Sequence, residues 1–366
     1  MIENFSQDVY TYLQGVSLPI VMYGMGKGAD KILSVFERYG IVVSDFFASD
    51  GFVRGHLFHG KRVLSYSEVC ERYRDGFTVV MSFASSREDV LENVCKIKGE
   101  REFFLPDVPV AGDDIFTLEF FNSHKKEILA ARALFDDEES KRIFDNVINY
   151  KLSGNLDYLF AAESNEELFI KEILHPERFR VCADLGAYNG DSIRHLLSFT
   201  DSVERIIAAE PDEKTFKKLC LYIEGENRCK IDAYPFAMYD RDTVLLFEKA
   251  GNRGSAADFL GSAKKSVEVT ARCPDTLFAG EERLDYIKYD VEGCEYEALS
   301  ASAETIKRLS PSMLISAYHK SEDIFALPLL AEGLCSASPF EYKFYLRRLR
   351  GVPAFDINLY AVSLKD

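Results

Sequence analysis

DLGAYNG, at residues 184–190, follows an apolar, strand-like run and leads into a helix-like stretch, and this turn decides the fold. A strand, a glycine turn and a helix in this order are typical of α/β sheets that bind nucleotides. Gly186 is expected to let the backbone approach a ligand closely, and Gly190 to begin a helix whose first amides favour an anion. Asp184 stands before the first glycine, whereas glycines themselves begin a dinucleotide fingerprint. A carboxylate here suits a ligand with an amino or sulfonium group and disfavours a pyrophosphate.

A second acid, Glu210, ends the next predicted strand, 20 residues after Gly190. A carboxylate at that distance can accept hydrogen bonds from both hydroxyls of a ribose. The acid–glycine turn and the ribose acid together are typical of a site for S-adenosylmethionine (SAM).

Strand and helix signals alternate from residue 180 to the end of the chain. The last two predicted strands, KFYLRRL and DINLYAVSL, are separated by a turn with Gly351 and Pro353, which predicts a pair of strands. Residues 179–366 are therefore expected to form one α/β sheet with an antiparallel edge at its C-terminal end.

The N-terminal part is expected to be a separate, smaller α/β domain. Residues 1–112 alternate strand and helix signals in a βαβαβ pattern that predicts a small parallel sheet. Residues 113–178 are acidic and helical in pattern, and they are expected to form a connector that packs on one or both domains.

The N-terminal domain has a glycine turn of its own, in which Gly24, Gly26 and Ala29 fit the pattern G-x-G-x-x-A. Asp45 stands at the end of the next predicted strand, 21 residues after Gly24, as in a dinucleotide site. The turn is expected either to bind a nucleotide or nucleotide-sugar or to serve packing alone, and both readings stay open. At roughly 110 residues, this part is too small to hold a separate catalytic domain of a dehydrogenase.

The composition excludes several classes of protein. The net charge is −16 and none of the three segments is basic, which argues against nucleic acid as a partner. The N-terminus has no basic region ahead of an apolar run, and the longest uncharged stretch, Val9–Gly26, is too polar to span a bilayer. The eight cysteines include no CxxC pair and are expected to be reduced. We therefore expect a cytoplasmic protein without a membrane span.

Three further features have plain structural readings. The glycine-rich loop GNRGSAADF at residues 251–259 is expected either to cover a substrate or to be an ordinary hairpin turn. The histidines other than His319 show no metal-ligand spacing. A solvated strand face is expected for the basic run Lys343, Arg347, Arg348 and Arg350, although a phosphate-bearing substrate could use it as an anion site.

Residues 180–362 resemble the FkbM-type SAM-dependent methyltransferases. The pattern KxDVEGxExxxL is the most specific part of the resemblance, and the chain has Tyr188-Asn189 where many members have the asparagine first. The matching blocks, in the family's order, are DLGAYNGDS, AAEPDEKTF, PFAMYDRD, DYIKYDVEGCEYEAL, LISAYHKSEDI, YKFYLRRL and INLYAV. The N-terminal segments VMYGMGKGADKIL and GKRVLSYSEV are similar to small Rossmann-like domains attached to sugar-modifying enzymes of surface-polysaccharide pathways.

The resemblance implies a class I methyltransferase fold, with a seven-stranded Rossmann-like sheet whose last strand is antiparallel. It also implies SAM as the methyl donor and O-methylation, commonly of a sugar hydroxyl, so a carbohydrate or another small hydroxyl compound is the expected acceptor. The implied SAM-binding residues are Asp184, Gly186, Ala187, Asn189 and Gly190 for the methionine end, Glu210 for the ribose and Ala237 beside the adenine.

Methyl transfer to a hydroxyl requires an aligned donor and acceptor and removal of the hydroxyl proton. Four groups at predicted strand ends are candidates: Asp290, Glu292, His319 and Lys320. His319 ends the strand SMLISAYH, and its ordinary pKa suits a general base near neutral pH. Asp290 could orient the substrate or bind a divalent ion together with Glu292, although a charge at a helix N-terminus also explains Glu292. A metal-free base relay would use the same three groups.

Two other functions stay open at this point. One is an enzyme that uses a nucleotide-sugar or NAD(P) and is centred on the N-terminal glycine turn. The other is a non-catalytic scaffold that binds SAM.

Overall fold

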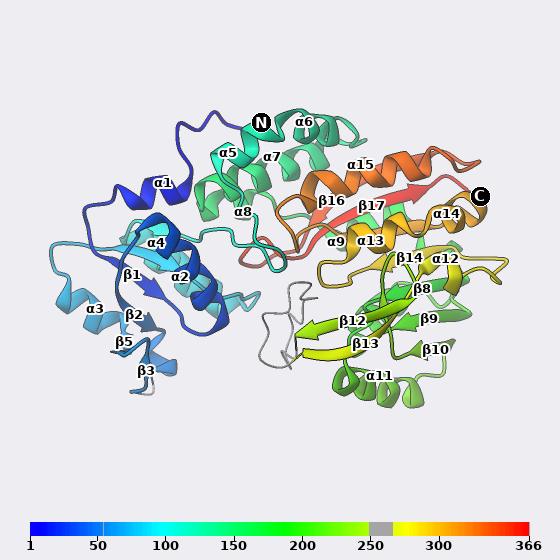
Figure 1. Cartoon of the computed structure of the whole chain (residues 1–366), viewed down its shortest axis with the longest axis horizontal. Coiled ribbons are helices and arrows are strands. Elements are labelled where there is room, and N and C mark those ends of the chain that lie inside the picture. The colour runs from blue at the N-terminus through cyan, green and yellow to red at the C-terminus, as the bar shows by residue number, and fades with distance from the viewer. Residues whose placement is uncertain (54, 249–265, 366) are drawn as a thin grey trace.

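The computed structural model describes residues 1–53, 55–248 and 266–365, so the loop at 251–259 lies outside the described residues (Figure 1). The chain begins in an α/β part, continues through a group of helices and ends in a larger α/β part. Among the described residues, no helix has both the length and the apolar character needed to cross a bilayer. All eight cysteines are free thiols.

The first part is a five-stranded sheet in the order β5-β2-β1-β6-β7, and all of its neighbouring strands are parallel. Its strands are β1 (Ile20–Tyr23), β2 (Val43–Ala48), β5 (Leu64–Ser65), β6 (Thr78–Met81) and β7 (Phe103–Phe104). The last of these pairs with β6 and extends the sheet by one short edge strand. The accompanying elements are α1 (Val9–Gln14), α2 (Lys27–Tyr39), α3 (Tyr66–Arg72), α4 (Glu88–Glu100) and a small hairpin of β3 (Leu57–Phe58) and β4 (Lys61–Arg62).

The helices of the middle part pack onto the C-terminal sheet. They are α5 (Leu118–Ser123), α6 (Lys125–Ala133), α7 (Glu138–Ser153), α8 (Leu156–Ala161) and α9 (Glu166–Phe169), followed by a π-helical turn at Ile170–Leu174 and a 3₁₀ turn at Pro176–Arg178. Asp137 caps the start of α7 by accepting a hydrogen bond from the Ser140 amide, and Gly154 ends α7 in the left-handed conformation.

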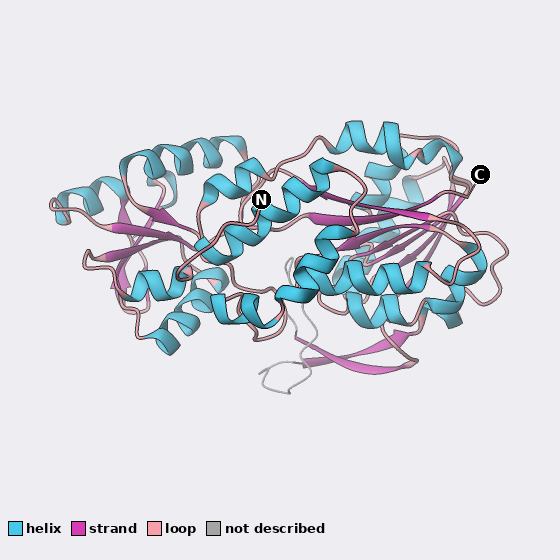
Figure 2. Ribbon diagram, turned by 90° about the horizontal axis from the view of Figure 1, so that it is seen from above, coloured by secondary structure: helices cyan, strands magenta, loops and turns pink. Residues whose placement is uncertain are grey.

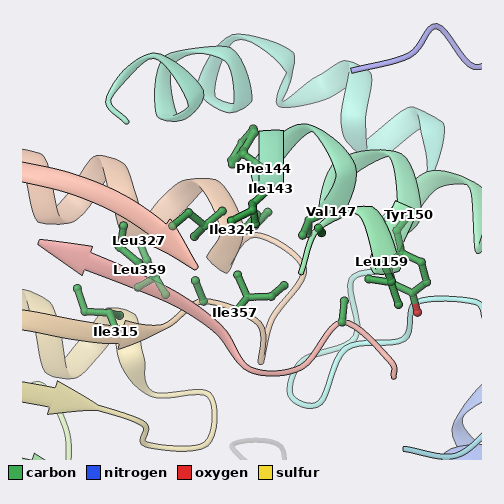
Figure 3. Packing of buried hydrophobic residues seen from close by; sticks show 14 of the residues in the cluster. Ile143, Phe144, Val147, Tyr150, Leu159, Ile315, Ile324, Leu327, Ile357 and Leu359 are labelled. Carbon is green, nitrogen blue, oxygen red and sulfur yellow. The ribbon is translucent and has the colours of Figure 1, made fainter. Parts of the chain in front are cut away.

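The apolar face of α7 joins the parts into one core. Ile143, Phe144 and Val147 are fully buried, and Ile143 lies beside Ile324 of the C-terminal part (Figure 3). The same buried cluster continues into the N-terminal sheet. The segment is therefore a structural part of the fold, because its removal would expose apolar surface on both sheets.

The C-terminal part is a mixed seven-stranded sheet in the order β10-β9-β8-β14-β15-β17-β16. The first five of these strands are parallel, whereas β17 runs antiparallel to both of its neighbours. The strands are β8 (Val181–Leu185), β9 (Arg205–Ala209), β10 (Lys230–Tyr234), β14 (Tyr286–Tyr289), β15 (Ser312–Ser316), β16 (Tyr342–Arg348) and β17 (Ile357–Ser363). The α/β class predicted from the sequence is thus confirmed.

Helices lie on both faces of this sheet, and a small three-stranded sheet projects beside it (Figure 2). The helices are α10 (Asp191–Leu197), α11 (Glu213–Gly225), α12 (Pro274–Leu277), α13 (Glu295–Ser300), α14 (Ala303–Leu309) and α15 (Asp323–Cys335). The small sheet consists of β11 (Ala237–Met238), β12 (Thr243–Glu248) and β13 (Ser266–Arg272).

The prediction that the basic run on β16 is solvated is wrong for Arg347 and Arg348, which are almost completely buried. Arg347 forms an ion pair with Asp137 at 2.6 Å and donates a hydrogen bond to the Ser140 hydroxyl. The Arg348 guanidinium donates to the carbonyl of Leu159 at 2.9 Å and to two carbonyls of the turn at residues 351–353. Sequence periodicity does not reveal this burial, because the covering helices come from a distant part of the chain.

Replacing Arg348 with methionine is expected to lower the free energy of unfolding by about 2–4 kcal/mol, because several buried carbonyls lose their donor. Urea denaturation followed by circular dichroism measures the change. The control is Lys343→Met on the same strand, which is half-buried and should change stability by less than about 0.5 kcal/mol. Equal stability of the two variants would contradict the structural role of Arg348.

Candidate active site

The predicted site residues meet at the carboxyl edge of the seven-stranded sheet. Because β8, β9, β14 and β15 are parallel, the residues that follow them lie along the same edge. Asp184 lies near the end of β8 and Glu210 follows β9, while Asp290 follows β14 and His319 lies shortly beyond β15.

Lys288 on β14 connects the carboxylates of Asp184 and Asp290. Its ammonium lies 3.1 Å from Asp290, 3.5 Å from Asp184 and 3.4 Å from the carbonyl oxygen of Gly186. Burial alone would lower the pKa of Lys288, but the two carboxylates raise it, so the lysine stays charged. Burial raises the pKa of Asp184, although Lys288 and the Ser192 hydroxyl, 2.5 Å away, favour its ionised form.

His319 is buried among three carboxylates. Its Nδ1 lies 3.0 Å from Glu295, while its Nε2 lies 3.5 Å from Glu292 and 3.8 Å from Asp290. Burial alone would lower the pKa of His319, but the carboxylates, Glu295 above all, raise it well above its ordinary value. The surrounding carboxylates therefore favour the protonated form of the imidazole in the free protein.

Glu295, at the start of α13, organises the loop after β14. Its two carboxylate oxygens accept hydrogen bonds from the amides of Val291 and Gly293, at 2.7 and 3.0 Å, and the same side chain faces His319. The site prediction omitted both Glu295 and Lys288. The signal was present, because they are the last glutamate and the lysine of the pattern KxDVEGxE.

The loop between Glu292 and Glu295 is shaped by a contact with the segment that precedes α5. Glu292 and Gly293 both have a positive φ, of 54° and 100°. A Cβ at Gly293 would lie 2.5 Å from the Cβ of Ala111, so a larger residue would push this segment away. The Ala111 amide also donates to the carbonyl of His319 at 2.8 Å. The segment around Ala111 therefore forms part of the wall of the site.

Glu210 is held by its neighbours in an orientation set by the backbone. One of its oxygens accepts from the Tyr188 amide at 2.9 Å and the other from the Asp212 amide at 2.8 Å. Burial raises the pKa of Glu210 to about 7, despite these two amide donors. Ala237, the residue predicted beside the adenine, is buried at the start of β11 and pairs with Ala271.

Close packing requires glycines in the turn at 184–190, and Gly190 precedes α10 as the sequence predicted. A Cβ at Gly186 would lie 1.8 Å from the Asp290 carbonyl oxygen, and a Cβ at Gly190 would lie 2.4 Å from the Tyr222 ring. The amides of Gly186 and Ala187 both donate to the Ala209 carbonyl, and the Gly190 amide donates to Ala187. The glycines thus serve close packing, and these three amides are already used within the protein.

Asn189, predicted to contact the methionine end, accepts a hydrogen bond from Arg194 at 2.9 Å through its side chain. Lys320, the fourth catalytic candidate, lies 3.4 Å from Glu297 and so belongs to a neighbouring ion pair.

A cavity of about 300 Å³ opens beside this charged cluster, between the sheet, α10 and the segment from α9 to residue 174. Its floor consists of side chains that alternate along four neighbouring strands. These floor residues are Cys182 and Asp184 on β8, Tyr286 and Lys288 on β14, Leu314 and Ser316 on β15, and Asn358 and Tyr360 on β17.

One group of described residues has the spacing to hold a divalent metal ion. Ligand atoms of Asp290, Glu295 and His319 all lie within 4.8 Å of one another. This set contains Glu295 in place of the expected Glu292. Both oxygens of Glu295 already accept amide hydrogens, so the arrangement is equally complete as an ion-paired network of imidazolium and carboxylates.

The N-terminal glycine turn is also tightly packed. A Cβ at Gly28 would lie 2.2 Å from the Ser82 carbonyl oxygen, and one at Gly24 would lie 2.6 Å from Phe83. Asp45 lies in the middle of β2, not at its end, and binds Arg72 at 2.7 Å and the Tyr73 hydroxyl at 2.5 Å. The expected position of Asp45 was therefore wrong, and packing within this part accounts for its carboxylate.

Comparison with known proteins identifies the C-terminal part. Residues 184–344 match the family model of the methyltransferase FkbM domain. The crystal structure of methyltransferase FkbM from Methylobacillus flagellatus is similar over 96% of this chain and 92% of that one, with a TM-score of 0.70 and 19% sequence identity. Aeropyrum pernix fibrillarin in complex with SAM aligns over 50% of this chain and 66% of that one, with a TM-score of 0.30 and 12% identity. No curated protein matches the chain.

The chain therefore contains a methyltransferase FkbM domain and is a SAM-dependent methyltransferase. The whole-chain likeness to the Methylobacillus structure shows that the fold is shared beyond this domain.

Replacing Glu295 with glutamine is expected to lower the pKa of His319, because the carboxylate that most strongly favours the imidazolium is lost. Titration of the His319 imidazole by NMR measures the shift. The control is Glu297→Gln, on the same helix and paired with Lys320, which should leave the titration of His319 unchanged. An unaltered His319 titration in Glu295→Gln would show that this pairing does not set its charge.

Proposed function

We propose that the protein transfers a methyl group from SAM to a hydroxyl of a sugar, in a glycan, a polysaccharide or a glycosylated metabolite. The observation that carries the proposal is the arrangement at the carboxyl edge of the sheet. Three carboxylates surround His319 there, and one of them, Asp290, is joined through Lys288 to Asp184. Sugar hydroxyls are weak acids, so their methylation requires a proton acceptor of this kind.

The residues present fit SAM. Glu210 has both oxygens oriented by amides, and each oxygen keeps a lone pair for a ribose hydroxyl. The carboxylates of Asp184, Asp290, Glu292 and Glu295 outnumber the two cations, Lys288 and His319, so the site favours a positively charged ligand. When bound, SAM supplies the methyl group from a sulfonium centre.

Glu295 and His319 together provide the proton acceptor. Because Nδ1 faces Glu295, the neutral imidazole keeps its hydrogen there and leaves Nε2 as the basic atom. The side chains of Asp290 and Glu292 lie next to Nε2 and are partly exposed, whereas the His319 side chain is buried. The hydroxyl of the acceptor donates to one of these carboxylates, and its proton passes on to His319. The proton ends on His319 because Lys288 lowers the pKa of Asp290 against the effect of burial, whereas Glu295 raises the pKa of His319.

We propose a division of the chain into a small Rossmann-like module at residues 1–112, a helical connector at 113–178 and the methyltransferase at 179–366. We also place the reaction in the cytoplasm, since the eight free thiols suit a reducing compartment.

Glu210→Ala is expected to abolish SAM binding in calorimetry, because the ribose loses its acceptor. In the wild-type protein, affinity should fall about tenfold from pH 8 to pH 6, since protonation of a group with a pKa near 7 removes a charged acceptor. The control is Glu224→Ala, an exposed residue of α11. Undiminished SAM affinity in Glu210→Ala would overturn the SAM site proposed here.

His319→Ala is expected to reduce methyl transfer from labelled SAM to sugars by at least about 10²-fold, while SAM affinity is retained. Because only the neutral imidazole accepts a proton, the wild-type rate should rise with pH through the raised pKa of His319. The control is His124→Ala, in the turn between α5 and α6. A rate that falls at alkaline pH would assign the base to a carboxylate and make the imidazolium the active form.

A further inference from the structure

Asp290, Ser316 and Asn358 form a row across three neighbouring strands on the face that lines the cavity. Ser316 on β15 is paired with Asn358 on β17, and Lys288 is paired with Leu314, which brings Asp290 beside Ser316. The Ser316 hydroxyl interacts with Asp290 and helps to lower its pKa. Asn358 is thus one strand further from Asp290, on the side away from β8 and β9.

No contact within the described part of the fold explains why an asparagine stands at position 358. Asn358 is 9% exposed and lines the cavity, yet its carboxamide has no hydrogen bond to any residue in the described ranges. A carboxamide offers both a donor and an acceptor, and buried amides are normally paired. An unpaired one at the wall of a cavity therefore points to a ligand with hydroxyl groups.

The charge of the cavity selects against anions. Five carboxyl groups line it, those of Glu166, Asp184, Asp191, Asp290 and Asp356, against one lysine and one histidine. Lys288 is engaged by two of these carboxylates, and His195 lies 3.2 Å from a third, Glu166. A phosphate or carboxylate group would therefore meet repulsion, with no available counter-charge among the described residues of the lining.

We propose that the β15–β17 side of the cavity is the acceptor subsite, that Asn358 binds a hydroxyl of the acceptor there, and that the acceptor is a neutral or amino-bearing polyol. The inference rests on the proposed function, which assigns the β8–β9 side to SAM through Asp184 and Glu210. The polyol then has one hydroxyl beside Asp290 and a second within reach of Asn358, on neighbouring strands. Asn358 is a specificity residue in this arrangement.

Saturation-transfer NMR on the protein loaded with S-adenosylhomocysteine (SAH), the demethylated product of SAM, tests the subsite. The probes are methyl hexosides, hexosamines, uronic acids and hexose phosphates. We expect the first two classes to bind and the last two to bind at least about tenfold more weakly. Asn358→Ala should weaken binding of the favoured sugars by about tenfold without changing SAH affinity, because one buried hydrogen-bonding group is lost.

The matched control is Asn227→Ala, an exposed asparagine after α11 that should leave sugar binding unchanged. Preferential binding of uronic acids or hexose phosphates would overturn the proposal, as would no binding of any methyl hexoside or hexosamine. Undiminished sugar binding in Asn358→Ala would remove Asn358 from the subsite. Failure of SAH to bind the wild-type protein would instead overturn the proposed function itself.

Discussion

The site depends on how its buried negative charges are compensated. Asp184, Asp290 and Glu295 meet where parallel strands end, and carboxylates crowded in a poorly solvated place repel one another. Lys288 compensates the first two at 3.5 and 3.1 Å, and His319 compensates the third at 3.0 Å. These ion pairs also connect β8 with β14, and β14 with β15. The same contacts therefore set both the geometry and the charge of this edge, because each cation pairs with a carboxylate from a different segment of the chain.

The parts of the chain outside the methyltransferase domain hold the walls of this edge. Ala111 packs against Gly293 and donates its amide to His319. The turn that Arg348 fixes also pairs with the N-terminal part, since Ser85 and Val352 exchange backbone hydrogen bonds at 2.8 and 3.0 Å. The first 178 residues thus contact the site and also support its structure. A domain that folded without them would lack the segment that contacts the loop around Glu292.

The sequence predicted what depends on local pattern. Alternating apolar runs and glycine turns place the strands, and strand ends then place Asp184, Asp290 and His319 along one edge, where the structure has them. It could not predict contacts made by residues distant in the chain. The burial of Arg348 depends on helices almost two hundred residues earlier, and the reason for Gly186 depends on the carbonyl of Asp290. Glu295 and Lys288 were visible in a motif, but their roles follow only from the distances between side chains.

The direction of β17 explains why Asn358 could not be predicted from the sequence as a site residue. In a parallel sheet, site residues follow the carboxyl ends of strands, so candidates are sought after each strand. β17 runs antiparallel to β15 and β16, which flank it. Its first residues therefore lie at the edge of the sheet where β15 and β16 end. Asn358, the second residue of β17, therefore stands beside Ser316. This topology gives the two sides of the edge different side chains. The acids at the ends of β8 and β9 suit a cationic donor, and the uncharged amide on β17 suits a hydroxyl.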